Sequence, residues 1–292
     1  MLTVSIACTA GGLAGVGCGG EDSSEGPPSP APAFYLTASS ASDLRHQAYD
    51  AAARFARKQG PGSALLMLDF GAARRHRGSW GVSLRSGTFF SNDEVHSALQ
   101  AAAQGYHDKY RQGEVTIVYV NSNANLGDPG HRFQALNKRT AREAGEEQAK
   151  AIRDLHLYPN ESIAVGGDIE PGYDLVGSPE VSIELVAGAA AESGGPYYDI
   201  GTAPCRANRC VNGWTPRDIC AVASGGGRQA LPEVYFAIQA VGWANVQKQC
   251  GIKTFAGASA SPVGDLSPEQ SWRRLGEETG AEVGDALVVW PG

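Results

Sequence analysis

The sequence predicts an α/β protein with the (β/α)8 architecture of a TIM barrel, and three observations support this prediction. Eight short β-rich runs alternate with helical segments, which favours parallel strands joined by crossover helices. These runs span about 230 residues, close to the length typical of such a barrel. Acidic, amide and aromatic residues end several runs, where a barrel places its active site.

The N-terminal segment predicts export. Residues 1–18 are apolar or small and uncharged, and they end at Cys18. They resemble a bacterial lipoprotein signal, in which such a cysteine becomes lipidated, and a cleaved signal without a lipid is the alternative. The segment is too short and too rich in glycine for a transmembrane span. Residues 19–42 are rich in Ser, Pro and Gly and predict a flexible tether, which leaves residues 43–292 as a single barrel domain.

The β-rich runs and helical segments follow in order along the chain. We predict strands at residues 64–70, 115–121, 162–170, 196–201, 219–224, 232–236, 253–259 and 286–290. We predict helices at residues 92–111, 132–155, 179–193, 238–249 and 267–279, with only a remnant at 215–218. The fifth crossover thus lacks a helix, and the barrel is expected to be irregular around strands 5 and 6.

A doubly wound open sheet is the main rival architecture. A nucleotide-binding sheet of that kind would carry a glycine-rich turn after its first strand. The first strand here leads into LDFGAARRHRG, which is not a G-x-G-x-x-G motif. The run GGGR at residues 225–228 lacks the Lys-Ser/Thr pair of a phosphate-binding loop. We therefore expect no nucleotide cofactor.

Charge limits the partners of the chain. The net charge is −7 and the isoelectric point is near 5.4. Such a balance argues against binding to nucleic acid or to an anionic membrane surface. We expect a monomer that meets a membrane only through a lipid anchor at Cys18.

Four further cysteines predict two disulfides in an exported chain. Cys205 and Cys210 follow the fourth strand at the mouth of the barrel, whereas Cys220 opens the fifth strand and Cys250 precedes the seventh, both at the opposite end. We therefore predict the bridges Cys205–Cys210 and Cys220–Cys250. A zinc site is the alternative, but the spacing is not a standard zinc pattern and no histidine accompanies it.

Side-chain alternation suggests which residues enter the barrel. In the stretch AVGGDIE, Asp168 and Glu170 share one face of the third strand, about 7 Å apart at their Cα atoms. Buried carboxylates are costly unless they are paired or functional, so a ring of them indicates a site. The same alternation predicts that the following residues also face the mouth: Asp69, Tyr119, Asn121, Asp199, Glu233, Tyr235 and Trp290.

Carboxylates with amides and aromatics are typical of a carbohydrate site. Glycoside hydrolysis needs a protonated carboxyl group and an ionised one. We expect Glu170 to be the general acid, and Asp168, Asp69, Asp199 or Glu233 to be the second group. Asp168 and Glu233 are favoured for this role. No metal is expected, because the six histidines lie away from the strand ends and no H-E-x-x-H occurs.

The runs GGDIEPGYD, YYDIGTAPC, GWTP, ALPEVY, FAGAS and SWRRL resemble those of secreted actinobacterial-type proteins with a glycoside-hydrolase-like barrel. This resemblance covers residues 60–290 and implies fold and location. The D-I-E triplet is also similar, more distantly, to the D-x-E of family 25 lysozymes and family 18 chitinases. That resemblance implies that Glu170 donates the proton and that Asp168 assists it.

The sequence thus predicts an exported, extracellular or cell-surface glycoside hydrolase. Its substrate would be a cell-wall glycan such as peptidoglycan, or another extracellular glycan. The alternative is a barrel that binds a glycan or another surface partner without catalysis, since a barrel fold does not imply chemistry.

Overall fold

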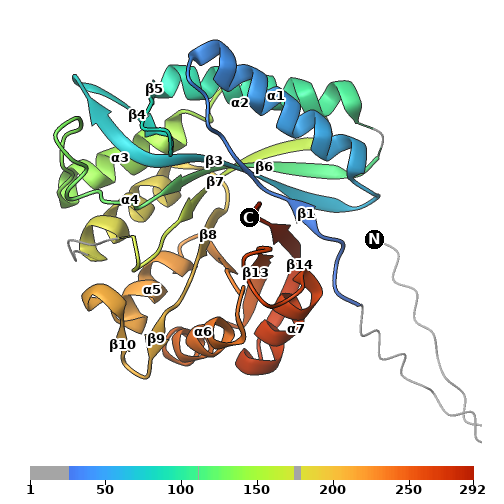
Figure 1. The fold of residues 1–292 in the computed structure, drawn as a ribbon, viewed down its shortest axis with the longest axis vertical. Coiled ribbons are helices and arrows are strands. Elements are labelled where there is room, and N and C mark those ends of the chain that lie inside the picture. Colours follow the sequence, from blue (N-terminus) through green and yellow to red (C-terminus); the bar gives the residue numbers. More distant parts are fainter. Residues whose placement is uncertain (1–25, 111, 174–178) are drawn as a thin grey trace, which may run out of the picture.

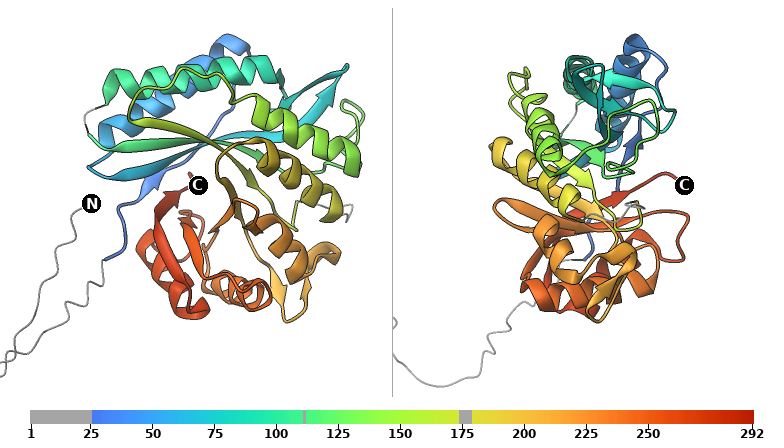
Figure 2. Two further views of the ribbon diagram at one scale, coloured as in Figure 1. Left: turned by 180° about the vertical axis from the view of Figure 1, so that it is seen from behind. Right: turned by 90° about the vertical axis from the view of Figure 1, so that its left-hand side faces the viewer.

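The computed structural model describes residues 26–110, 112–173 and 179–292, and it shows a mixed α/β fold built on parallel strands. The helices lie on the outside and the strands between them, as Figures 1 and 2 show from three sides. The α-helices of the described chain are Ala41–Lys58 (α1), Asn92–Lys109 (α2), Lys138–Lys150 (α3), Pro179–Glu192 (α4), Pro216–Ala223 (α5), Ala237–Cys250 (α6) and Pro268–Thr279 (α7). A short 3-10 helix covers Val211–Gly213.

Seven strands of five or more residues run parallel to one another. They are Ser63–His76 (β3), Glu114–Ser122 (β6), Glu161–Asp168 (β7), Tyr197–Gly201 (β8), Arg228–Pro232 (β12), Thr254–Ala260 (β13) and Glu282–Val289 (β14). The remaining strands of the described chain are Ala31–Pro32 (β1), Phe34–Tyr35 (β2), Ser79–Ser83 (β4), Phe89–Ser91 (β5), Cys205–Arg206 (β9), Arg209–Cys210 (β10) and Ser224–Gly225 (β11).

The parallel strands form two sheets that are linked at both edges. One sheet has the order β12-β8-β7-β6-β3 with β2 beside β3, and the other has the order β1-β14-β13. Only Ala33 separates β1 from β2, and its N–H donates to the carbonyl of Val289 at 2.8 Å. At the other edge, a parallel bridge joins Glu233, just after β12, to Ser259 on β13. The two sheets are therefore joined by the chain at one edge and by a single bridge at the other.

A separate hydrophobic core lies on each face of the parallel strands. The helix-side core packs helix residues such as Leu99 and Leu185 against strand residues such as Tyr119. The interior cluster contains residues from both sheets and is defined by Ala33, Met67, Val118, Val120, Ala164, Tyr198, Ile200, Leu231, Val288 and Trp290. Because both faces of the strands are buried, their sequences are nearly continuous runs of apolar residues.

Several predicted helices are confirmed: α2, α4, α6 and α7 lie within about two residues of the predicted bounds. Local capping explains where two of them begin. Ser91 caps α2 and accepts a hydrogen bond from the N–H of Glu94, and Ser267 caps α7 in the same manner. Such side chains satisfy backbone donors that the first helical turn leaves free.

The predicted fifth strand, residues 219–224, is wrong, because these residues lie in α5. Thr215 caps this helix through a reciprocal hydrogen-bond pair with Asp218, and Pro216 stands at its first position, where proline suits a helix. These start signals outweigh the β-branched residues that follow them. The strand predicted at 232–236 is instead β12, which ends at Pro232. The crossover expected to lack a helix therefore has one.

The predicted tether is also wrong over its second half. Residues 31–35 form β1 and β2, which pair with β14 and β3, and α1 begins at Ala41. Leu36 and Ala38 are 3% and 0% exposed, so this segment belongs to the core. The proline-rich composition predicted a flexible tether, and the two strands, of two residues each, are too short to give a strand pattern. The predicted export signal and Cys18 lie outside the described residues.

Both predicted disulfides are confirmed: Cys205 bonds Cys210, and Cys220 bonds Cys250. The second bridge joins α5 to α6 rather than two strand ends. The two disulfides are compatible with an extracellular protein. Within the described residues, none of the helices combines the length and hydropathy needed to cross a membrane.

Removing the disulfides should destabilise the protein unequally. The Cys220–Cys250 bridge closes a separation of 30 residues and the Cys205–Cys210 bridge one of 5. From loop entropy, replacing both cysteines of the longer loop by serine should cost about 3.5 kcal/mol, and of the shorter loop about 2 kcal/mol. Urea unfolding of the two double variants measures the difference. A larger loss for the Cys205–Cys210 variant would contradict this ranking.

Candidate functional site

Three carboxyl groups meet at the carboxyl ends of β7 and β12. They belong to Asp168, Glu170 and Glu233, and one carboxylate oxygen of each lies within 4.8 Å of the others. All three residues are buried. These are the residues that the sequence predicted to be catalytic, and the structure brings them together. We call them the acid cluster.

The backbone of the acid cluster is held by neighbouring strands. Asp168 is the last residue of β7 and pairs with Ser122 of β6. The side-chain amide of Asn123 accepts from the N–H of Glu170 and donates to its carbonyl, both at 3.0 Å. The N–H of Glu233 donates to Gly201 at 3.0 Å. The backbone position from which each acidic side chain extends is therefore fixed by hydrogen bonds.

Hydrogen bonds fix two of the three carboxyl groups. One oxygen of Glu170 accepts from the N–H of Thr202 at 3.2 Å, and Glu233 accepts from the hydroxyl of Tyr235. The side chain of Glu170 is close enough to Glu233 to raise the pKa of Glu233. Two carboxylates this close repel each other, which favours a proton on Glu233. Oδ1 of Asp168 has no hydrogen-bond partner among the residues that the structure describes.

The acid cluster favours protonation. Burial raises the pKa of Asp168 well above its ordinary value, and the charges of Glu233 and Glu170 raise it further. Burial likewise raises the pKa of Glu233, and the charge of Glu170 adds to it. Asp69, on β3, lies near enough to raise the pKa of Asp168 as well, and burial raises its own pKa to about 6. These acids therefore retain protons at a pH where exposed carboxyl groups are ionised.

Aromatic and basic side chains border the acid cluster. The rings of Tyr35 and Trp290 stack with their centroids 4.9 Å apart. The guanidinium carbon of Arg85 lies 3.6 Å from the centroid of Tyr35, and its Nη2 lies 3.9 Å from Oδ2 of Asp69. Burial raises the pKa of Tyr35 and of Tyr173, so both hydroxyl groups remain donors.

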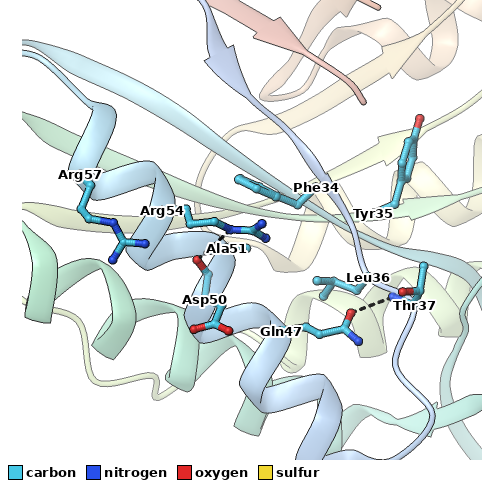
Figure 3. Close-up of a pocket in the computed structure, with 9 residues that line it drawn as sticks. All are labelled: Phe34, Tyr35, Leu36, Thr37, Gln47, Asp50, Ala51, Arg54 and Arg57. Carbon is cyan, nitrogen blue, oxygen red and sulfur yellow. Dashed lines mark hydrogen bonds between the residues drawn. The ribbon is translucent and has the colours of Figure 1, made fainter. Parts of the chain in front are cut away.

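Sequence reasoning missed Tyr35 because it lay in the predicted tether. Figure 3 shows how β2 positions it: Tyr35 turns away from α1, whereas Phe34 lies on the side of α1 under Arg54. The run AFYLT shows no alternation of apolar and polar residues, so no local pattern marked this short strand. The cavity in Figure 3 has a volume of about 470 Å³, but none of the acid cluster lines it.

A second cavity opens beside the acid cluster. It has a volume of about 350 Å³, and it lies next to Asp69 and Asp168. The other residues that line it are Gly71, Ala72, Arg74, Ser83, Leu84, Arg85, Ser122, Ala124 and Tyr173. We call this space the Arg74 cavity. It offers room for a ligand group within reach of the acids.

Two other predicted site residues also face the interior. Tyr235 and Trp290 both pack against the interior cluster, and Tyr235 donates its hydroxyl to Glu233. Trp290 is 2% exposed, and its Nε1–H has no acceptor. The structure thus groups these two with Asp69 around the acid cluster.

Three predicted site residues do not face the interior. Tyr119 lies in the helix-side core, edge-on to Phe70 at 5.0 Å, and Asn121 shares its face of β6. On β8, Tyr198 and Ile200 enter the interior cluster, so Asp199 points toward the helices. The expected orientation is therefore wrong for Tyr119, Asn121 and Asp199. Alternation alone could not settle it, because both faces of these strands are buried.

The acid cluster can either share protons or hold a cation. Among the described residues, it is the one group of three potential metal ligands close enough to share an ion. Carboxylate oxygens suit hard cations such as Mg²⁺ and Mn²⁺. The sequence predicted no metal, because its histidines lie away from the strand ends and no H-E-x-x-H motif occurs.

Comparisons with known proteins give no family. No protein-family model matches the chain, and no curated protein matches it. Among solved structures, the chain is similar to a sugar phosphate isomerase/epimerase from Parabacteroides distasonis, with a TM-score of 0.44 and 11% identity. The alignment covers 92% of this chain and 89% of the other.

The prediction of an exported glycoside hydrolase is corrected by these findings. The solved structure reported above is a sugar phosphate isomerase/epimerase, not a glycoside hydrolase.

Replacing Asp69 by asparagine should stabilise the protein at high pH. The folded-state pKa of about 6 exceeds the ordinary 3.8, so the folded state binds the proton more tightly and stability falls as the pH rises from about 4 to about 6. Two pKa units correspond to about 3 kcal/mol. Asp69→Asn should gain up to this amount at pH 8 and nothing at pH 4.

Denaturant unfolding across this pH range measures the effect. Asp128→Asn is the matched control, because Asp128 is an exposed aspartate in a loop. It should leave the pH dependence unchanged. A native-like loss of stability between pH 4 and pH 6 in Asp69→Asn would contradict the assignment to this residue.

Proposed function

We propose that the protein binds a carbohydrate and catalyses proton transfer on it, as a sugar isomerase or epimerase does. The observation that carries this proposal is the close approach of the buried carboxyl groups of Asp168, Glu170 and Glu233, whose oxygens lie within 4.8 Å of one another. Such a set holds a proton and a carboxylate at the same time. Isomerisation of an α-hydroxy carbonyl compound needs one of each.

The chemistry is a pair of proton transfers. A carboxylate removes the proton from the carbon next to the carbonyl, while a protonated carboxyl group donates to the carbonyl oxygen, which gives an enediol. Reprotonation at the other carbon, with loss of the hydroxyl proton, completes the isomerisation. A raised pKa makes Asp168 a stronger base, and the Glu170–Glu233 pair supplies the proton.

Unpartnered polar atoms support a polyhydroxylated ligand. Oδ1 of Asp168 is an acceptor, Nε1–H of Trp290 is a donor, and the hydroxyl of Ser259 can act as either. Ser259 is wholly buried and pairs with Glu233 across the sheet edge. Buried polar groups normally find partners, so their grouping here favours a ligand with several hydroxyl groups.

Two further features remain proposals. The pairings of β1 with β14, of β2 with β3, and of Glu233 with Ser259 support a closed eight-stranded barrel in which residues 31–35 act as the first strand. The two disulfides support a site of action outside the cell, and a lipidated Cys18 would fasten the chain to a membrane.

Deuterium exchange tests the proposed activity. The protein is incubated in D₂O with aldoses, ketoses, uronates and sugar phosphates, and NMR detects deuterium on the carbon next to the carbonyl. Native protein should catalyse this exchange with at least one sugar. Glu233→Gln should slow it by about 10²-fold or more, the usual contribution of acid–base catalysis.

The matched control is Glu161→Gln, because Glu161 begins β7 at the end opposite Asp168. Burial raises the pKa of Glu161 to about 6, so this control also removes a carboxyl group with a raised pKa. It should keep the native rate. Native protein that exchanges no sugar, with or without added Mg²⁺ or Mn²⁺, would contradict the proposal, as would full activity in Glu233→Gln.

A further inference from the structure

Arg74 is a buried cation without a matching anion. It lies on β3, lines the Arg74 cavity and is 7% exposed. Its Nη1 and Nη2 donate to the carbonyls of Ala73 and Ala124 at 3.0 and 2.7 Å, and its Nε–H has no acceptor. Among the residues that the structure describes, no carboxylate forms an ion pair with it.

A buried charge of this kind is costly. Removing a guanidinium from water is offset only by an anion or by full hydrogen bonding. Burial accordingly lowers the pKa of Arg74 to about 10. Carbonyl oxygens and the ring of Phe133, 5.7 Å from the guanidinium carbon, supply only partial compensation.

Other donors line the same cavity. Arg85 is half-exposed at its rim, and Ser83 and Ser122 contribute hydroxyl groups. Asp69 and Asp168 line the same space, beside the acid cluster. A ligand in this cavity thus meets guanidinium and hydroxyl donors as well as acids. Its volume of about 350 Å³ is near the lower limit of small-molecule pockets, which suits one sugar unit.

We propose that the Arg74 cavity binds the anionic group of a carbohydrate, a carboxylate or a phosphate, with Arg74 as its main counter-ion. This inference rests on the proposed function, because it names the substrate class of the same site. The substrate is thus an acidic sugar whose carbonyl end reaches the acid cluster. Guanidinium groups bind both carboxylate and phosphate through paired hydrogen bonds.

Calorimetric titration at pH 7 and constant ionic strength tests this substrate class. The ligands are glucose, glucuronate and glucose 6-phosphate, so the last two separate a carboxylate from a phosphate. Native protein should bind at least one acidic sugar about tenfold or more tightly than glucose. Arg74→Met should lose that preference. Equal affinity of native protein for all three sugars, or a preference that survives in Arg74→Met, would overturn the proposal.

Two further variants control for folding and for general charge. Arg132→Met removes an exposed arginine that contacts the same Phe133 ring, and it should keep the preference. Arg74→Lys keeps the charge, and it should keep a weaker preference. Because titration measures binding without turnover, a failed exchange assay with an intact preference would refute the proposed function alone.

Thermal unfolding supplies a readout that a merely structural arginine would not give. Sulfate should raise the melting temperature of native protein more than that of Arg74→Met, relative to chloride at equal ionic strength. Without anions, Arg74→Met should melt no lower than native protein, because it loses an uncompensated charge. A strongly destabilised or unfolded Arg74→Met would contradict the claim that this charge lacks a partner.

Discussion

The close burial of three carboxyl groups is the constraint on which the rest of the site depends. Asp168, Glu170 and Glu233 can occupy one buried space only if protons or a cation remove most of their charge. Burial and the nearby charge of Glu170 raise the pKa of Glu233, which favours a proton on that carboxyl group. Because neighbouring strands hold the backbone of each acid, side-chain rotation alone cannot fully separate the charges.

The short strand pair β1 and β2 completes the surroundings of the acids. It fills the seam between β14 and β3 and places Tyr35 against Trp290 and Arg85. The stretch AVGGDIE shows a related use of small residues. Gly166 and Gly167 leave room on their two faces for β8, whose Tyr197 hydroxyl would collide with a side chain at Gly167. These two glycines thus allow β7 to pack closely against β8 up to Asp168, the last residue of β7.

Sequence reasoning predicted the parallel α/β pattern, both disulfides and the three residues that form the acid cluster, from apolar runs, cysteine positions and side-chain alternation. It failed where a competing signal was stronger or absent. The capping residues Thr215 and Asp218 outweighed strand-like residues, and residues 31–35 were too short a strand to give a pattern. Alternation misplaced Tyr119 and Asp199 because a strand buried on both faces carries no polar side to read. The Arg74 cavity is lined by residues from distant parts of the chain, so no local sequence motif predicts it.

Infrared spectroscopy of native protein at pH 7 tests the central claim most directly, because protonated carboxyl groups have their own carbonyl stretching band. The account predicts that this band is present, weakens in Glu233→Gln through loss of the proton on Glu233, and persists in Glu161→Gln. A spectrum of native protein without any protonated carboxyl band would contradict it. The charges of the acid cluster would then have to be neutralised by bound cations instead.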